Sequence, residues 1–479
     1  MCALVWSIVN PVGPYLLVAD GTFSDLHSLH FAGSMINNCL KVNRTRFVLL
    51  LKLLWLSSFL VACTPTPQAN VISYLAAKQF GTLTLPPSPL PSGTLTGLVF
   101  YNGEPIAGAT VLVAERTGTP HAAQTDAQGR YQIVDIPPGQ YVPAAVAPGF
   151  EEIALTDWFG FPGLVTIHPG ALTTAPTFTL KRHTPKPLPQ QLALATNLVL
   201  TTTAVTTASF PAGALAQVQA YQFEYAGAQV DTLRVYLPIS VTAEAKLPML
   251  FMVYPTDVDL WSAVSTAYAA QGYAMVAMSP TAARGVDIDA HADDARVALT
   301  LARQGALGSN IDSRKVVALG GSFSSAIMHR LLADVTATGD GAIAGWVTVG
   351  GISNALSGTA DFYAGRLEIP PRYEYLIPAL GNPQYYPLPF LRFSPVYTAA
   401  QLPPTLIIHT AVDLVTPIEQ AYQLEAALRA ANVPVEVFYY QDVSHYLQID
   451  ANMSDEARAM FYLAAEFADR MLGHDTPRE

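Results

Sequence analysis

From about residue 192 to residue 475, short apolar runs alternate with longer amphipathic stretches. The apolar runs have the length of strands and include LPMLFMVYP, GYAMVAMSP, KVVALGGS and PPTLIIHT. The stretches between them have helical periodicity, as in the last one, where Ser454 can cap a helix and Gly473 can end it. This alternation predicts an α/β fold, with a mostly parallel sheet covered by helices on both faces.

The length and composition limit what the rest of the chain can be. At 479 residues it has room for two or three domains. Hydrophobic residues make up 51% and charged residues only 13%, while 37 prolines and 32 glycines indicate many turns, so we expect a globular, loop-rich protein. The net charge of −11, without any basic stripe, argues against a nucleic-acid partner.

Residues 93–182 show a different pattern, in which short alternating runs are interrupted by turn signals every few residues. This spacing predicts a small antiparallel sandwich, with a tight turn from Asp126 to Gly129. The segment resembles the carboxypeptidase-regulatory-like domain, a transthyretin-like sandwich, at the motifs Gly97, GEPIAGATV, TDAQGRY and PGQY. The resemblance implies a spacer or docking module whose partner is not indicated. A proline-rich linker, residues 183–191, follows it, and we expect few contacts to cross this hinge.

The N-terminal part has the features of a membrane-targeting signal. Residues 41–46 are basic, an apolar run from Phe47 to Ala62 follows, and Cys63 comes next. The run is short for a spanning helix and contains Lys52. Leu60-Val61-Ala62-Cys63 resembles a bacterial lipobox, which implies cleavage before Cys63 and a diacylglycerol on its thiol.

We therefore expect residues 1–62 to be an N-terminal extension and lipoprotein signal peptide, and residues 63–92 an extended, proline-rich tether. Met35 is a better candidate for the translation start, so we assign no function to the 34 residues before it. The alternatives are an ordinary signal peptide or an anchor helix. The expected location is the bacterial cell envelope, outside the cytoplasm and attached to the membrane.

One buried strand of the predicted sheet ends in Gly320-Gly321-Ser322-Phe323-Ser324, and a helix follows at once. A serine on such a sharp turn has an exposed hydroxyl and tolerates only small neighbours. The segment resembles the nucleophile elbow of α/β-hydrolases, with Ser324 in place of the usual second glycine. By itself the motif is weak, because small-residue turns between strand and helix are common.

Two later residues follow the order serine, acid, histidine. Asp413 comes just after the strand LIIHT, and His445 lies on the loop after the strand VEVFYYQD. We predict Ser322 as nucleophile, His445 as general base and acid, and Asp413 as the group that orients the imidazole. His409 is expected at a strand end beside the acid. No metal and no cofactor are predicted, and the acidic run Asp287–Asp294 is expected to be a solvated helix entry.

For the oxyanion donors we expect the backbone N–H of Phe323 and a group after the strand LPMLFMVYP. Pro255 has no N–H to donate there. The prolyl-oligopeptidase branch uses a tyrosine hydroxyl at this strand end, so the resemblance implies Tyr254 as the donor. The N–H of Thr256 is the alternative.

An insertion at about residues 352–400 is rich in aromatic residues and proline and shows no regular pattern of helix or strand. We expect it to be a lid that lines an apolar or aromatic acyl site, or a structural flap with its own small core.

Over residues 192–475 the chain resembles α/β-hydrolases of the dienelactone-hydrolase and prolyl-oligopeptidase type, through the motifs above, Gln271-Gly272-Tyr273 and Ser394-Pro395. The first hypothesis is a serine hydrolase that cleaves a small acyl ester. The alternatives are a prolyl-oligopeptidase-like peptidase and a catalytically silent surface-binding lipoprotein.

Overall fold

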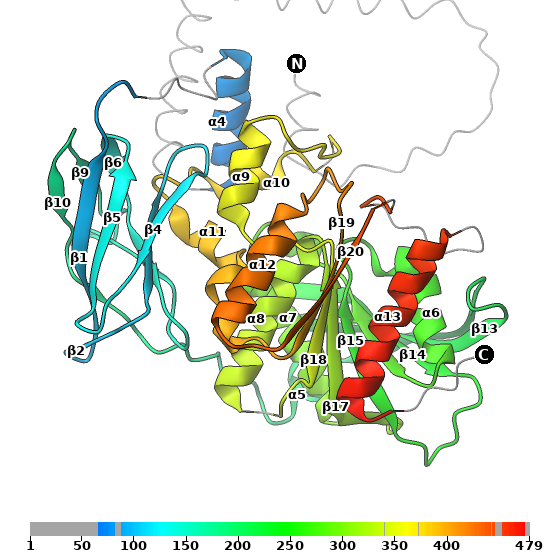
Figure 1. Ribbon diagram of the computed structural model, residues 1–479. Helices are drawn as coiled ribbons and strands as arrows, with labels where there is room; N and C mark the ends of the chain where they lie inside the picture. Colours follow the sequence, from blue (N-terminus) through cyan, green and yellow to red (C-terminus); the bar gives the residue numbers. More distant parts are fainter. Residues whose placement is uncertain are drawn as a thin grey trace, which may run out of the picture. The chain divides into compact units, whose positions relative to one another are not determined.

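The computed structural model describes residues 66–81, 88–339, 341–371, 373–441, 443–445 and 453–474 (Figure 1). Cys63, the predicted signal peptide and the rest of residues 1–65 lie outside these ranges. Residues 65–479 form one compact unit, so the predicted sandwich and the α/β part belong together.

The α/β part is built on a sheet that contains nine strands among the described residues. Its spatial order is β12-β13-β14-β16-β15-β17-β18-β19-β20. In this order, the strands from β16 to β20 are parallel to one another, while β12, β13 and β14 join antiparallel. The predicted α/β fold is confirmed. The bounds are β12 Val199–Ala208, β13 Ala214–Tyr225, β14 Ala228–Pro238, β15 Leu247–Val253, β16 Ala274–Met278, β17 Ile311–Gly321, β18 Gly345–Val349, β19 Thr405–Thr410 and β20 Val435–Tyr440.

Helices cover both faces of this sheet (Figure 1). Side chains alternate along β15, so Phe251 packs into the core beneath α7 and α8, whereas Leu250 packs into the core beneath α6 and α13. Ser454 and Gly473 cap α13 as predicted. The helices are α5 Leu192–Ala195, α6 Ser262–Ala270, α7 Ile288–Arg303, α8 Phe323–Thr338, α12 Glu419–Ala430 and α13 Asp455–Leu472, with 3₁₀ turns at Val258–Trp261, Ala282–Arg284, Pro395–Tyr397 and Ala399–Gln401.

The sandwich consists of short strands around a separate apolar core that includes Leu95, Val111, Tyr131 and Phe178. The predicted turn is present, because the Gly129 N–H donates to the Asp126 carbonyl at 2.9 Å. The strands are β1 Gly93–Tyr101, β2 Glu104–Pro105, β3 Thr110–Ala114, β4 Pro120–Gln124, β5 Arg130–Ile136, β6 Gly139–Tyr141, β7 Ala144–Val146, β8 Ile153–Ala154, β9 Val165–Ile167, β10 Leu172–Thr174 and β11 Phe178–Thr179.

The expectation of an extended tether is wrong for part of its length, because Pro67–Gln79 forms helix α4. The Thr66 hydroxyl accepts the Ala69 N–H at 3.2 Å, and Pro67 occupies the first turn, where proline is compatible with a helix. The helix packs on the lid: the Tyr74 hydroxyl donates to Glu374 at 2.6 Å, and Lys78 pairs with the same carboxylate.

The lid also has more regular structure than predicted. It contains α9 (Ala355–Tyr363), α10 (Leu376–Leu380) and α11 (Pro387–Arg392). Asn354 caps α9 by accepting the N–H groups of Leu356 and Ser357. The prolines and the shortness of these helices hide their periodicity in the sequence.

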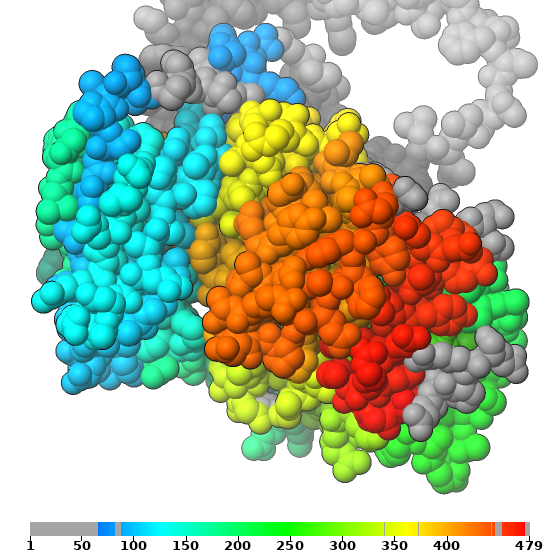
Figure 2. Space-filling view, in the orientation of Figure 1, coloured from blue at the N-terminus to red at the C-terminus, as the bar shows by residue number. Residues whose placement is uncertain are grey.

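The hinge of residues 183–191 does not separate the two parts as expected. Glu152 of the sandwich pairs with Arg330 on α8, and His183 contacts Asp334 at 2.6 Å. The Val142 N–H donates to the Gln384 carbonyl of the lid at 2.9 Å. In Figure 2 the sandwich, in cyan, lies alongside the lid, in yellow. Polar contacts between segments far apart in sequence therefore cross the interface.

Candidate active site

Ser322 occupies a strained turn between β17 and α8. Its φ of 48° and ψ of −129° are unusual for a residue with a side chain and are tolerated only where surroundings enforce them. Its N–H faces the carbonyls of Val349 and Gly350 at 3.2 Å, so the end of β18 holds the turn. A Cβ at Gly321 would lie 2.2 Å from the Val349 carbonyl oxygen, which explains the glycine.

Ser324, which departs from the elbow pattern, is fully buried and closes the turn. Its hydroxyl donates to the Gly321 carbonyl at 2.7 Å and accepts the Gly321 N–H at 3.0 Å. A serine at this position therefore satisfies two backbone groups of the turn, and the departure is compatible with an elbow.

The structure brings Ser322, His445 and Asp413 together at the ends of their strands, where the sequence predicted them. His445 Nε2 lies 3.1 Å from Ser322 Oγ, and its Nδ1 lies 2.7 Å from Asp413 Oδ2. The other carboxylate oxygen of Asp413 accepts the N–H groups of Val415 and Thr416 at 2.9 and 2.8 Å. The acid is buried, so these donors fix its direction toward the imidazole.

The comparisons with known proteins agree with the two-part architecture. Residues 94–181 match the carboxypeptidase regulatory-like domain, and residues 305–474 match the prolyl oligopeptidase family. The chain is a serine hydrolase, and residues 305–474 are similar to this family. The match of this hydrolase domain includes all three residues of the Ser–His–Asp set.

A search of curated proteins finds no significant match. Similar solved structures include a thermostable esterase from Pseudomonas putida, at 15% identity and a TM-score of 0.43, covering 55% of this chain and 84% of that one. Esterase 2 of Thermogutta terrifontis phosphonylated by sarin is 20% identical with a TM-score of 0.39, covering 52% of this chain and 93% of that one.

His409 lies beside the acid of the hydrolase domain, as predicted. Its Nε2 is 2.7 Å from the Thr416 carbonyl and 3.7 Å from Asp413 Oδ2. Burial lowers the pKa of this imidazole, which favours the neutral form and a hydrogen bond donated to Thr416.

Gly350 is a site residue that sequence reasoning missed. Its φ is 55°, and a Cβ there would lie 3.4 Å from Asp413 Oδ2 and 3.5 Å from His445 Nδ1. The pair Gly350-Gly351 directly after a buried strand was the available signal.

The expected role of the Tyr254 hydroxyl as oxyanion donor is wrong. Tyr254 is fully buried on the α6 face of the sheet, where its hydroxyl lies 2.8 Å from Ser265 Oγ and its ring stacks on Trp261. Burial raises the pKa of this phenol well above its usual value. The strand continues its alternation through Tyr254 and turns the ring into the core, which the sequence motif alone does not reveal.

The two backbone candidates remain compatible with the geometry. Phe323 is the first residue of α8, so its N–H has no acceptor within the helix. Thr256 lies in the short segment between β15 and the next 3₁₀ turn, and its hydroxyl accepts the Trp261 indole N–H at 2.9 Å.

The aromatic residues of the lid are divided among several environments. Phe390 and Phe393 are buried, and the Phe393 ring lies 5.7 Å from that of Phe323, beside the nucleophile. A cavity of about 240 Å³ lies between α4 and the lid and does not include the Ser–His–Asp set. It is lined by Tyr74, Lys78, Phe362, Tyr363, Leu367, Ile369 and Glu374. The lid thus has a packing role, and an acyl site beneath it stays a prediction.

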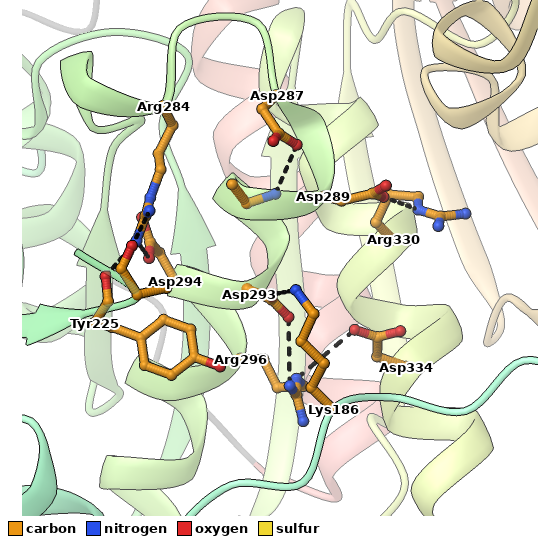
Figure 3. Close-up of polar contacts among 12 residues, drawn as sticks. Lys186, Tyr225, Arg284, Asp287, Asp289, Asp293, Asp294, Arg296, Arg330 and Asp334 are labelled. Carbon is orange, nitrogen blue, oxygen red and sulfur yellow. Dashed lines mark hydrogen bonds and ion pairs between the residues drawn. The ribbon is translucent and has the colours of Figure 1, made fainter. Parts of the chain in front are cut away.

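The acidic run Asp287–Asp294 begins a helix as predicted, since Asp287 caps α7 by accepting the Ala290 N–H at 3.1 Å. Asp287 is exposed, as expected, but Asp289, Asp293 and Asp294 are ion-paired (Figure 3). Arg284 pairs with the buried Asp294 at 2.7 Å, and Arg330 reaches Asp289 at 2.9 Å. These carboxylates hold neighbouring elements together.

Proposed function

We propose that the chain is a lipid-anchored, extracytoplasmic serine hydrolase that cleaves carboxylic esters through an acyl-enzyme. The hydrogen-bonded series Ser322–His445–Asp413, at the end of three strands of one sheet, is the observation that carries this proposal. An unassisted serine hydroxyl is a weak nucleophile at neutral pH, and this series supplies the base and its orientation.

In the proposed reaction, His445 Nε2 takes the proton of Ser322 while Ser322 Oγ forms a bond to the acyl carbon. The bond from that carbon to the alcohol oxygen then breaks, and His445 gives its proton to the departing alcohol. In the second half, His445 takes a proton from water as the water oxygen bonds to the acyl carbon. The bond from that carbon to Ser322 Oγ then breaks, His445 returns the proton to Ser322, and the carboxylic acid leaves. Asp413 accepts the N–H of His445 Nδ1 and stabilises the imidazolium.

We assign the oxyanion donors to the backbone N–H groups of Phe323 and Thr256. The Tyr254 hydroxyl is occupied by Ser265 within the core. Losing a true oxyanion donor typically costs a hundredfold or more in turnover, so Tyr254→Phe is expected to stay within about threefold of wild type. Steady-state kinetics of the purified variant measures this, and a large loss of turnover would restore the tyrosine assignment.

The position of Tyr254 also departs from the pattern of the peptidase alternative. The prolyl-oligopeptidase branch uses a tyrosine hydroxyl at this strand end, and here that hydroxyl is withdrawn from the site. The peptidase alternative nevertheless keeps the support of the family match over residues 305–474.

The deciding experiment combines active-site labelling with substrate profiling. A fluorophosphonate probe should label the purified protein at Ser322, and p-nitrophenyl esters should be hydrolysed faster than aminoacyl p-nitroanilides. The reverse preference would favour the peptidase, and neither labelling nor turnover would favour the silent surface-binding lipoprotein.

The lipid anchor rests on the sequence around Cys63. In the part of the chain that the structure describes, no helix combines the length and apolarity needed to cross a membrane. In a bacterial host, labelled fatty acid should be incorporated into the wild type and not into Cys63→Ser. Equal incorporation in both would exclude acylation at this cysteine.

A further inference from the structure

A loop of the sandwich displays large aromatic side chains to solvent. It connects β8 to β9 and has the sequence LTDWFGFPGL over residues 155–164. Trp158 is 95% exposed, Phe159 is 81% exposed and Phe161 is 63% exposed. These three large aromatic side chains are close together in the sequence and exposed, so they form an apolar patch of the kind that marks an interaction site.

The loop has a defined internal structure. The Asp157 carboxylate accepts the N–H groups of Phe159 and Phe161, both at 2.9 Å, and the Asp157 N–H donates to the Phe161 carbonyl at 2.8 Å. Thr156 and Pro162 form a β-bridge at its base. Because the turn is already closed, little backbone entropy is lost when its aromatic residues bind a partner.

A chain of contacts links the base of this loop to helix α4. The Leu155 N–H donates to the Pro143 carbonyl at 2.9 Å, and the adjacent Val142 N–H donates to Gln384 in the lid. A few residues earlier in the lid, the Ala379 carbonyl accepts the side-chain amide of Asn70 on α4 at 3.4 Å. Successive contacts therefore link the base of the loop, the lid turn and α4.

Helix α4 also displays apolar side chains and is close in sequence to Cys63. Ile72 and Leu75, one turn apart, are exposed, and so is Phe80 at the end of the helix. Thr66, which caps α4, is three residues beyond Cys63. A lipid on Cys63 would hold α4, and through these contacts the sandwich that carries the loop, near the bilayer.

We propose that the loop of residues 155–164 inserts Trp158 and Phe159 into the interfacial region of a lipid bilayer. Tryptophan partitions to that region because its ring is largely apolar while its N–H can reach water or headgroups. The sequence has no lysine or arginine between Arg130 and Lys181, so the contact is apolar and does not depend on anionic lipid. The proposal rests on the membrane address assigned to this chain under its proposed function.

The test uses full-length protein bound to neutral phosphatidylcholine vesicles, with Trp158 fluorescence obtained by subtracting the spectrum of Trp158→Phe. Insertion shifts the Trp158 emission to the blue and lets lipids brominated along the acyl chain quench it. If the protein is bound to vesicles but Trp158 keeps the emission of a water-exposed indole, the proposal is overturned. This reading needs neither catalysis nor acylation, so it is distinct from failure of the hydrolase or anchor assignments.

A second measurement compares vesicle partitioning in the Cys63→Ser background, which removes the lipidation site. Phe159→Ser should weaken partitioning by about tenfold, whereas Leu172→Ser, at an exposed apolar position on β10, should not change it. Strong salt dependence or equal effects of the two variants would contradict insertion. Self-association without lipid that Phe159→Ser abolishes, with no Trp158 insertion, would assign the loop to a second copy instead.

Discussion

Among the residues that the structure describes, two partly buried histidine–aspartate pairs have nearly the same length. His445 Nδ1 lies 2.7 Å from Asp413 at the candidate active site, and His183 Nε2 lies 2.6 Å from Asp334 at the contact between sandwich and α8. The first imidazole has Ser322 Oγ at its other nitrogen. The second pair is instead surrounded by charge, with Arg296 3.7 Å from Asp334.

The difference shows that such a pair becomes a catalytic candidate only through its third partner. Asp413 is held by two backbone N–H groups, which fix its direction without competing positive charge. Asp334 is shared between an imidazole and a guanidinium, as in a structural ion pair. The hydrogen bond to Asp334 raises the pKa of His183, which favours its charged form. The same residue types thus form a candidate catalytic pair in one place and a structural ion pair, here called the clamp, in the other.

The largest effect is expected for Ser322→Ala. Since members of a catalytic set act as a unit, turnover should fall by about a millionfold and probe labelling should disappear. Ser444→Ala, at the exposed residue before His445, is the control and should retain activity. Residual labelling of Ser322→Ala would place the nucleophile elsewhere.

Asp413→Asn and Asp334→Asn test the comparison directly. The first change leaves the imidazole in the wrong tautomer, and kcat should fall by about ten-thousandfold. The second removes a clamp about three helical turns along α8 from Ser322, too far to contact the nucleophile, so kcat should stay within about threefold of wild type. Ester hydrolysis at neutral pH measures both, and similar losses in the two variants would erase the distinction.

Substitutions around the clamp should instead lower the free energy of unfolding. Arg330→Met leaves the buried Glu152 without its closest cation, and the free energy of unfolding should fall by about 3 kcal/mol. The exposed Arg366, paired with Asp361, offers a matched control, for which Arg366→Met should cost less than about 1 kcal/mol. Denaturant unfolding measures both. Equal midpoints would mean that the Glu152–Arg330 contact contributes little to the interface.

The smallest effect is expected for His183→Gln, and it should depend on pH. Because the folded-state pKa of His183 is raised, its stabilisation is complete at pH values below the ordinary histidine pKa of about 6.5 and is lost as pH rises through the raised value. The variant should therefore be less stable than wild type by about 1–2 kcal/mol at acidic pH, with a smaller difference at alkaline pH. Arg330, Arg296 and Glu152 also face this pair.

Thermal unfolding across pH measures this difference, with Asp334→Asn as the companion variant. If the clamp operates as described, His183→Gln should have no further pH-dependent effect in the Asp334→Asn background. A difference from wild type that grows toward alkaline pH would reverse the assigned sign.

The positions of the Ser–His–Asp set could be predicted because they depend on local order along the chain. Parallel strands end at one edge of a sheet, so residues that follow successive strands meet there. The prediction for Tyr254 was wrong because the side chains of a strand alternate between its two faces. One position more or less along the strand therefore decides whether the ring points to the site or into the core. Gly350 was missed because a glycine is needed there only for its closeness to Asp413 and His445. Those two residues lie 32 positions apart in the sequence, so no local pattern shows their contact with Gly350.

The sequence by itself determined the α/β and sandwich regions and the order of serine, acid and histidine, because periodicity and turn residues act over a few positions. Only the tertiary structure decided that α4 packs on the lid, that Glu152 finds Arg330 across 178 residues, and that Tyr254 points away from the nucleophile. Such contacts depend on how whole elements pack and on which buried charges must be paired, and no local pattern records that.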